Sequence, residues 1–218
     1  MSRHDLVILD QEGSVQLTLQ NTTLSVMILD RSGSMAKFGK APIQAVNSHL
    51  AGIKDAPPGS QQFCSVVSFA DHMRVEIPLG HALQIRPMER FNAGGNTLLW
   101  ETVDAVLGNL LSFIGKLDPQ LQKRLKVTVG VISDGEDNRS SKRYYPERLR
   151  ETSANAQAMG WELLVFGIGV DAESLARDMG FPTDKASAHT FEATEEGLAQ
   201  SSVIMTQSTL GGGWRQRE

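Results

Sequence analysis

Three oxygen-bearing side chains follow one another at alternate positions near the amino-terminal end of the chain. Asp30, Ser32 and Ser34 come directly after an apolar run, and Gly33 between the serines allows a tight turn. Carboxylate and hydroxyl oxygens in a compact loop suit a hard divalent cation such as Mg²⁺. We therefore take residues 24–34 as the candidate active stretch.

A second apolar run, residues 126–133, also ends in an aspartate, Asp134. Parallel strands in an open α/β sheet end at the same edge, where ligands bind, so we expect Asp30 and Asp134 to lie near one cation. A shared cation would offset the cost of bringing two carboxylates together. The loop at residues 94–97 precedes a long helical pattern, and the Thr97 hydroxyl is expected to cap that helix or to reach the same cation.

The elements that must position these loops alternate between strand and helix patterns. The apolar run at 24–29 is typical of a strand buried on both faces of a parallel sheet. This alternation predicts an α/β fold with a doubly wound, mostly parallel central sheet flanked by helices. Further strands are predicted at 63–69, 75–79, 126–133, 161–168 and 189–191, and helices at 40–54, 98–117, 146–159, 171–179 and 195–206.

The two ends of the chain lie outside this pattern. Residues 5–9 and 14–19 indicate a β-hairpin, which would either cover a sheet edge or form a separate ribbon. Residues 21–23 are predicted to be a polar break. The expected organisation is therefore an extension at 1–23, one domain at 24–208 and a tail at 209–218.

Composition limits the classes of function. With 218 residues, 40% of them hydrophobic, the chain suits one globular domain. A net charge of −4 argues against nucleic acid as the main partner, because phosphate binding needs a basic surface. The single cysteine, Cys64, excludes an internal disulfide. No apolar run is long enough for a signal peptide or a membrane span, so we expect a soluble cytoplasmic protein with no membrane partner.

Other polar side chains carry weaker signals. The five histidines have no ligand-like spacing, and Cys64 fits a small buried apolar group. Glu136 and Asp137 lie beside Asp134 and are expected to be solvated loop carboxylates.

Taken together, Asp30-x-Ser32-x-Ser34, Thr97 in a Gly-Gly-Asn-Thr loop, and Asp134 followed by glycine resemble the metal-ion-dependent adhesion site of the von Willebrand factor type A domain family. All five motif positions are filled by the expected residue type, in the expected chain order. The resemblance covers about residues 24–208 and extends to the intracellular bacterial members of the tellurite-resistance type.

This resemblance implies a magnesium or manganese ion held by Ser32 and Ser34, by Thr97 directly or through water, and by Asp30 and Asp134 largely through water. The ion would keep one position for an Asp or Glu carboxylate of a partner protein. The implied function is non-enzymatic binding, with an AAA+ ATPase, a kinase or a phosphatase as partner in a bacterial stress or defence system. In the family, ligand changes at the ion can be coupled to movement of the last helix.

Two alternatives compete with this interpretation. Asp, Ser and Gly are ordinary turn residues, so the loop at 30–34 alone is also compatible with a turn that holds no ion. A phosphotransferase of the haloacid dehalogenase type also has an aspartate after a buried strand. It needs a second acidic residue two positions later as the proton donor, and position 32 is serine.

Overall fold

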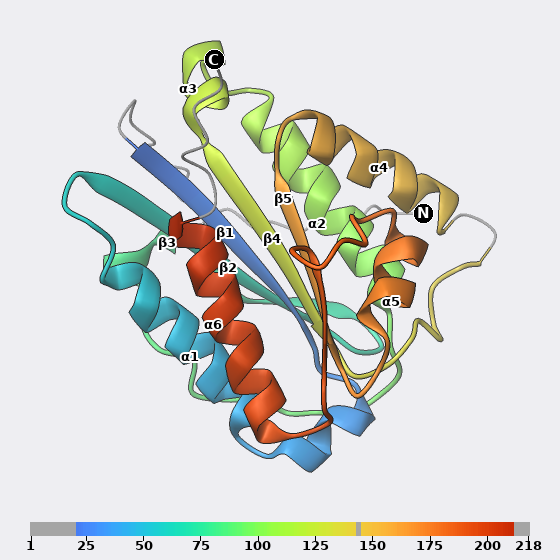
Figure 1. Ribbon diagram of the computed structural model, residues 1–218. Coiled ribbons are helices and arrows are strands. Elements are labelled where there is room, and N and C mark those ends of the chain that lie inside the picture. The colour runs from blue at the N-terminus through green and yellow to red at the C-terminus, as the bar shows by residue number, and fades with distance from the viewer. Residues whose placement is uncertain (1–20, 143–144, 212–218) are drawn as a thin grey trace.

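Six strands form one central sheet in the computed structural model, which describes residues 21–142 and 145–211 (Figure 1). In chain order the strands are β1 (Asn21–Asp30), β2 (Ser60–Phe69), β3 (Met73–His81), β4 (Lys126–Ser133), β5 (Glu162–Ile168) and β6 (Ala188–Phe191). Their order across the sheet is β3-β2-β1-β4-β5-β6. Neighbouring strands are parallel, apart from the antiparallel pair β2 and β3. The predicted mostly parallel α/β sheet is therefore confirmed.

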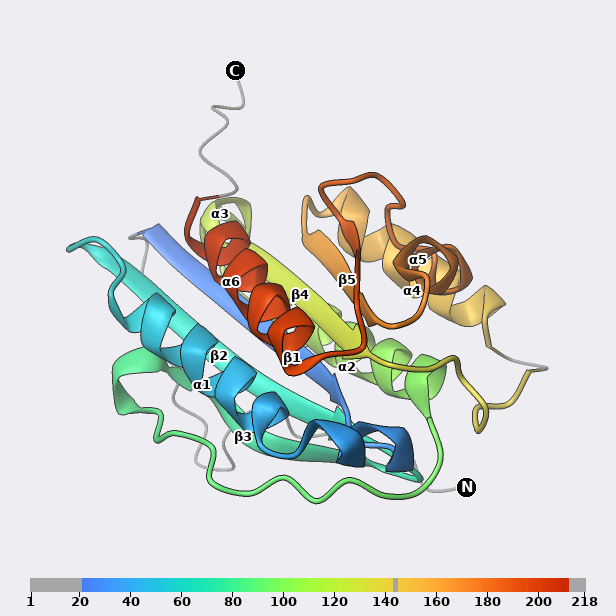
Figure 2. The same cartoon turned by 60° about the horizontal axis from the view of Figure 1, so that its bottom comes forward.

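Helices flank the sheet on both faces, as the doubly wound pattern predicts (Figure 2). In chain order the helical segments are the 3₁₀ turn η1 (Gly33–Phe38), α1 (Ala41–Lys54), the 3₁₀ turn η2 (Ala82–Gln84), α2 (Leu99–Ile114), α3 (Pro119–Arg124), α4 (Glu147–Ala158), α5 (Ala172–Met179) and α6 (Glu195–Gly211). Helices α2, α4 and α5 cover one face, and α1 and α6 cover the other. Among the described residues, no helix combines the length and the apolar character needed to span a membrane.

Strand β1 is a central strand of the sheet and is buried on both faces. Leu24, Val26 and Ile28 pack into the core beneath α2 and α4, whereas Met27 and Leu29 pack into the core beneath α1 and α6. A strand with apolar contacts on both sides gains from a continuous apolar run, because neither face meets water. This placement explains why the run shows no alternation of polar and apolar residues.

The start of β1 differs from the prediction of a polar break at residues 21–23. Thr22 and Thr23 are buried and continue the parallel ladder opposite Gln61 and Gln62 of β2. Two threonines are good strand residues because their branched side chains fit a pleated surface. Their polarity therefore does not interrupt the strand.

Helix α6 is longer than the predicted 195–206 and ends at Gly211. Near its carboxyl end the Lys126 ammonium donates to the main-chain carbonyls of Ser208 and Thr209. A lysine at this position supplies partners for carbonyls that have none within the helix. The predicted hairpin at residues 5–19 lies outside the described residues, and the division of the chain into extension, domain and tail stays a prediction.

A buried histidine connects the sheet to the two helices on one face. The His49 side chain, on α1, has no exposed surface; its Nε2 lies 3.1 Å from the Ser25 hydroxyl and its Nδ1 lies 3.0 Å from the Thr206 hydroxyl. Because Thr206 donates its own hydrogen to the Ser202 carbonyl, Nδ1 donates to Thr206. Burial disfavours the charged ring, so Nε2 of the neutral imidazole accepts the Ser25 hydroxyl and the network joins β1, α1 and α6.

Acid should destabilise the fold through His49. Burial lowers the pKa of His49 from its ordinary value of 6.5 to about 4. Between these two values the unfolded chain takes up a proton that the folded chain excludes, so the free energy of unfolding falls as the pH drops below 6.5. At pH 5 the loss from this group is about 2 kcal/mol.

Denaturant titrations at pH 7.5 and pH 5 measure this loss. The variant His49→Gln, which does not titrate, should lose less stability between the two pH values than the unaltered protein. Equal losses in both proteins would show that another group causes the acid sensitivity.

Candidate functional site

The Asp30 carboxylate, at the carboxyl end of β1, forms the floor of the candidate site. It has no exposed surface; Oδ1 accepts the Ser32 backbone N–H at 2.7 Å, and Oδ2 accepts the Ser133 hydroxyl at 2.5 Å. The pKa of Asp30 is raised to about 6, chiefly by burial; the hydrogen bonds from Ser133 and Ser32 oppose this rise, and the nearby charge of Asp134 adds to it. A carboxylate in this position is favoured in its charged form by a nearby cation.

Ser133 is a residue that the sequence prediction of the site missed. Leu29 of β1 pairs with Ile132 of β4, so the next residues along the two parallel strands, Asp30 and Ser133, are neighbours. The Ser133 hydroxyl is fully buried and donates to the carboxylate, which is a stronger acceptor than the carbonyl of Gly135 at 2.9 Å. Its position directly before Asp134 was the available signal.

The serines and the second aspartate form a chain of hydrogen bonds above Asp30. The Ser32 and Ser34 hydroxyl oxygens are 3.0 Å apart, and the Ser34 hydroxyl donates to Asp134 Oδ1 at 2.7 Å. Ser32 and Asp134 are buried, whereas Ser34 is exposed. The oxygens of two loops therefore meet at one edge of the sheet and lead from its buried floor to the surface.

The loop that carries Thr97 is joined to both of the other loops through its main chain. Gly33 N–H donates to the Gly95 carbonyl at 3.1 Å, which connects this loop to the loop after β1. On the other side, Thr97 N–H donates to Asn138 Oδ1 at 2.8 Å, and Asn138 N–H donates to the Thr97 carbonyl at 3.1 Å. Thr97 is thus held, buried, between the loops that follow β1 and β4.

A glycine allows this loop to approach its neighbour. Gly95 has a φ of 85°, and a Cβ atom at this position would collide with the Asp71 carboxylate. Asp71 accepts the backbone N–H of Asn96 at 3.1 Å and the side-chain amide of Asn96 at 2.7 Å. These two hydrogen bonds hold the loop from its exposed side. These hydrogen bonds lower the pKa of Asp71.

The expectation that Asp137 is a solvated carboxylate is wrong. Asp137 is buried, and its Oδ2 accepts the Trp100 backbone N–H at 2.8 Å in the first turn of α2. The Ser140 hydroxyl accepts the next N–H, that of Glu101, at 3.0 Å. Leu98 is the residue at the cap position, so the capping of α2 comes from the loop after β4 and not from Thr97.

The positive charge closest to Asp134 is an ammonium group. Lys37 Nζ lies 2.9 Å from Asp134 Oδ2, with 51% of the lysine side chain exposed and none of the aspartate side chain. Oδ2 is buried and has no hydrogen bond of good geometry from the described residues, so it faces this ammonium through charge alone. Lys37 belongs to η1 and is also absent from the site that the sequence predicts.

The donor set fits a hard divalent cation. Within residues 21–142 and 145–211 no group of three or more His, Cys, Asp or Glu side chains is placed to hold a metal ion, so a metal here would depend on hydroxyl groups as well. Two carboxylates and the hydroxyls of Ser32 and Ser34 lie together, and the loop of Thr97 adjoins them. Oxygen donors alone match the preference of Mg²⁺ and Mn²⁺.

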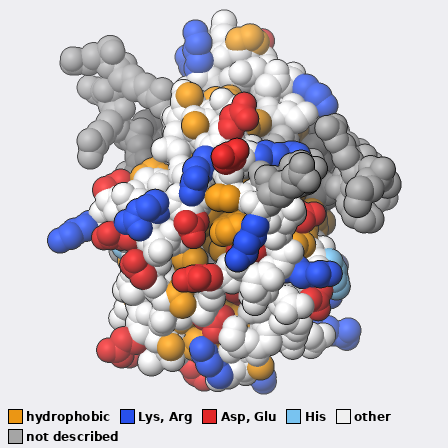
Figure 3. Space-filling view, turned by 90° about the vertical axis from the view of Figure 1, so that its right-hand side faces the viewer, with side chains coloured by type: hydrophobic (Ala, Val, Ile, Leu, Met, Phe, Trp, Pro, Cys, Tyr) orange, Lys and Arg blue, Asp and Glu red, His pale blue; other side chains and the backbone are white. Residues whose placement is uncertain are grey.

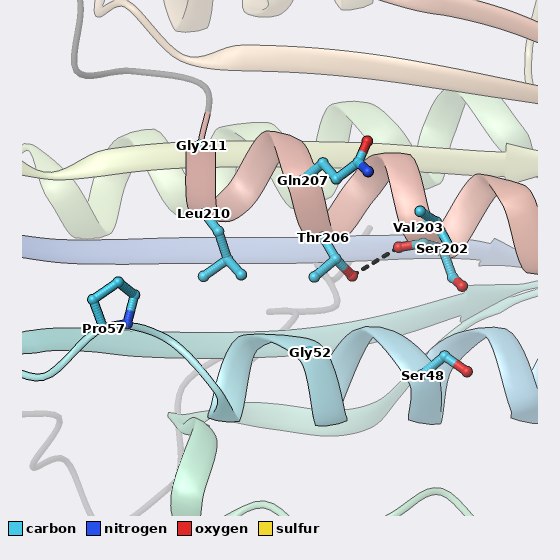
Figure 4. A pocket seen from close by; sticks show the side chains of 9 residues that line it. All are labelled: Ser48, Gly52, Pro57, Ser202, Val203, Thr206, Gln207, Leu210 and Gly211. Carbon is cyan, nitrogen blue, oxygen red and sulfur yellow. Dashed lines mark hydrogen bonds between the residues drawn. The ribbon is translucent and has the colours of Figure 1, made fainter.

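A separate groove of about 630 Å³ lies between α1 and α6 (Figure 4). Ser48 and Gly52 of α1 face Val203, Thr206 and Leu210 of α6 across it. The groove extends to the carboxyl end of α6, beside the amino end of β4, and therefore lies away from Asp30.

The fold is that of von Willebrand factor type A domains. A von Willebrand factor type A protein from Catenulispora acidiphila has a TM-score of 0.60 and 16% identity over 87% of this chain and 43% of its own. The ArnB paralog VWA2 from Sulfolobus acidocaldarius has a TM-score of 0.54 and 20% identity over 84% of this chain and 44% of its own.

The manganese-loaded TRAP protein of Plasmodium vivax has a TM-score of 0.56 and 15% identity, with coverage of 85% of this chain and 74% of that chain. This chain thus spans less than half the length of the Catenulispora and Sulfolobus proteins. No protein-family model and no curated protein sequence matches it.

Asp137→Ala should destabilise the protein by about 2 kcal/mol, because α2 loses a cap and buried N–H groups lose their acceptor. Denaturant titration measures the change. Glu136→Ala is the matched control, since Glu136 is the exposed neighbouring carboxylate and its loss should change the free energy of unfolding by less than about 0.5 kcal/mol. Similar losses in the two variants would contradict the capping role.

Proposed function

We propose that this chain is a non-enzymatic protein-binding module that takes up a divalent cation, Mg²⁺ or Mn²⁺. The proposed ligands are those that the sequence motif indicates, Asp30, Ser32, Ser34, Thr97 and Asp134, either directly or through water. A bound cation would offer a coordination position to an Asp or Glu carboxylate of a partner protein.

One observation carries this proposal: the hydrogen-bonded series from Ser32 through Ser34 to Asp134 at the sheet edge. These oxygens come from two loops a hundred positions apart in the chain, and the donors are hard oxygen groups. Exposure of Ser34 at the top of the series leaves the site accessible from solvent.

The charge balance supports an acidic partner. The proposed ligands contain two carboxylates and three neutral hydroxyl groups, which do not exceed the charge of a divalent cation. The filled site would therefore carry no net negative charge to repel a further carboxylate, which could bind the cation directly at an open coordination position. TRAP, a protein of the same fold, is manganese-loaded in its crystal structure, which supports a divalent cation here.

The distribution of charge on the surface favours a protein partner over nucleic acid. On the side of the molecule in Figure 3, Lys and Arg side chains are interspersed with Asp and Glu side chains. The net charge of −4 also disfavours phosphate backbones. We propose an AAA+ ATPase, a kinase or a phosphatase of a bacterial stress or defence system as the partner.

Phosphoryl transfer by Asp30 is the weaker hypothesis. A nucleophile must reach the substrate, but the Asp30 side chain has no exposed surface and both its oxygens accept hydrogen bonds. The residue two positions later is Ser32, which is no proton donor of the carboxylic acid type. Turnover of an aryl phosphate that Asp30→Asn abolishes would favour the enzyme over the binding module.

Asp30→Ala combined with Ser32→Ala should remove the binding of Mg²⁺ and Mn²⁺ while the domain stays folded, because Asp30 is at the carboxyl end of β1 and neither side chain belongs to the two apolar cores. Titration calorimetry measures the affinity, and circular dichroism monitors the fold. Ser48→Ala, a change at an exposed serine of α1, is the control and should bind as the unaltered protein does. Undiminished affinity in the double variant would refute the site.

A further inference from the structure

The two oxygens of the Asp134 carboxylate have different neighbours. Its Oδ1 accepts the Ser34 hydroxyl at 2.7 Å, and its Oδ2 faces the Lys37 ammonium at 2.9 Å. The aspartate side chain is completely buried, whereas half of the lysine side chain is in solvent. A buried negative charge is therefore balanced by a positive charge that stands at the rim of the site.

The other charged side chains near the site, Asp30 and Arg31, already have hydrogen-bond partners. Both oxygens of Asp30 accept hydrogen bonds, from Ser32 N–H and from the Ser133 hydroxyl. Arg31, on the same loop, directs its guanidinium away, with Nε donating to the Ser68 hydroxyl at 3.3 Å and Nη1 to the Asn92 carbonyl at 3.2 Å. Asp134 Oδ2 is thus the carboxylate oxygen that faces a movable charge.

We propose that Lys37 competes with the divalent cation for Asp134 and so sets the cation concentration at which the site fills. This inference rests on the proposed function of the site. In the absence of the cation the ammonium compensates the Asp134 charge, and the cation must displace it or bind a carboxylate whose charge is already partly neutralised. Both routes weaken cation binding, because affinity depends on the charge of the ligands.

The lysine can leave without disturbing the fold. Its ammonium is a hydrated point charge on a flexible stem, and half of the side chain is already exposed. In its position beside Asp134 the ammonium also lies 4.8 Å from the ring centroid of the buried Phe38, so an entering cation displaces it from two favourable neighbours. An arginine-like fork with several fixed hydrogen bonds would be harder to displace.

Calorimetric titration of the full chain with Mn²⁺, and separately with Mg²⁺, tests the competition. The variant Lys37→Met keeps much of the stem and removes the charge. It should bind each cation about two- to fivefold more tightly than the unaltered protein, in the range expected for the loss of one partly exposed ion pair. Lys37→Arg, which keeps the charge, should not gain affinity.

Lys40→Met is the matched control. It removes the same charge from an exposed position just before α1, three residues further along, and should bind the cations like the unaltered protein. A gain equal to that of Lys37→Met would overturn the inference, because net charge and not the Asp134 contact would then set the affinity.

A second measurement uses thermal unfolding in EDTA and in Mg²⁺. Lys37→Met leaves a buried carboxylate without its countercharge, so its midpoint in EDTA should be lower than that of the unaltered protein and should rise further when Mg²⁺ is added.

Failure of the inference and failure of the proposed function give different results. Equal cation affinity in the unaltered protein and in Lys37→Met overturns the role of Lys37 and leaves the metal site intact. Binding by neither protein overturns the metal site and the inference together. Binding by Lys37→Met alone supports the competition in its strongest form.

Discussion

The parallel pairing of β1 with β4 is the interaction on which the candidate site depends. It places Asp30 beside Ser133 at the carboxyl edge of the sheet and brings Asp134 within reach of Ser34. Both strands are buried on both faces, so neither can slip by a residue without moving apolar side chains into the wrong core. The stability of the central sheet therefore holds the two carboxylates in a fixed relation.

The loops at this edge support one another and also start a helix. Main-chain hydrogen bonds join Gly33 to Gly95, and Thr97 is bonded to Asn138 in the loop after β4. In that same loop, Asp137 accepts from the first turn of α2. A change in one of these loops would therefore shift the other two and the start of α2. Such mutual support suits a candidate site that must keep its side chains in fixed positions.

Charge compensation at Asp134 connects the observed site with the proposed one. In the structure the Lys37 ammonium balances the buried Asp134 carboxylate, and in the proposed second state a divalent cation takes over this role. Both states satisfy the same electrostatic requirement, because a buried carboxylate without a positive neighbour is costly. The His49 network lies in the core under α1 and α6, where it connects these helices to β1 and holds α6 against the sheet.

Local patterns in the sequence determined most of the elements and the motif. The apolar run before Asp30 predicted a central strand, and the alternation of Asp30, Ser32 and Ser34 predicted a loop rich in oxygen ligands. The tertiary structure alone decided that Ser133, Lys37 and Asp137 also belong to the site or support it. Their partners are defined by strand order and by loop contacts across long stretches of chain, as in the Ser133 bond to Asp30, which spans 103 positions. Periodicity reports burial within one element, but it carries no information about which distant side chain will compensate a buried charge or cap a helix.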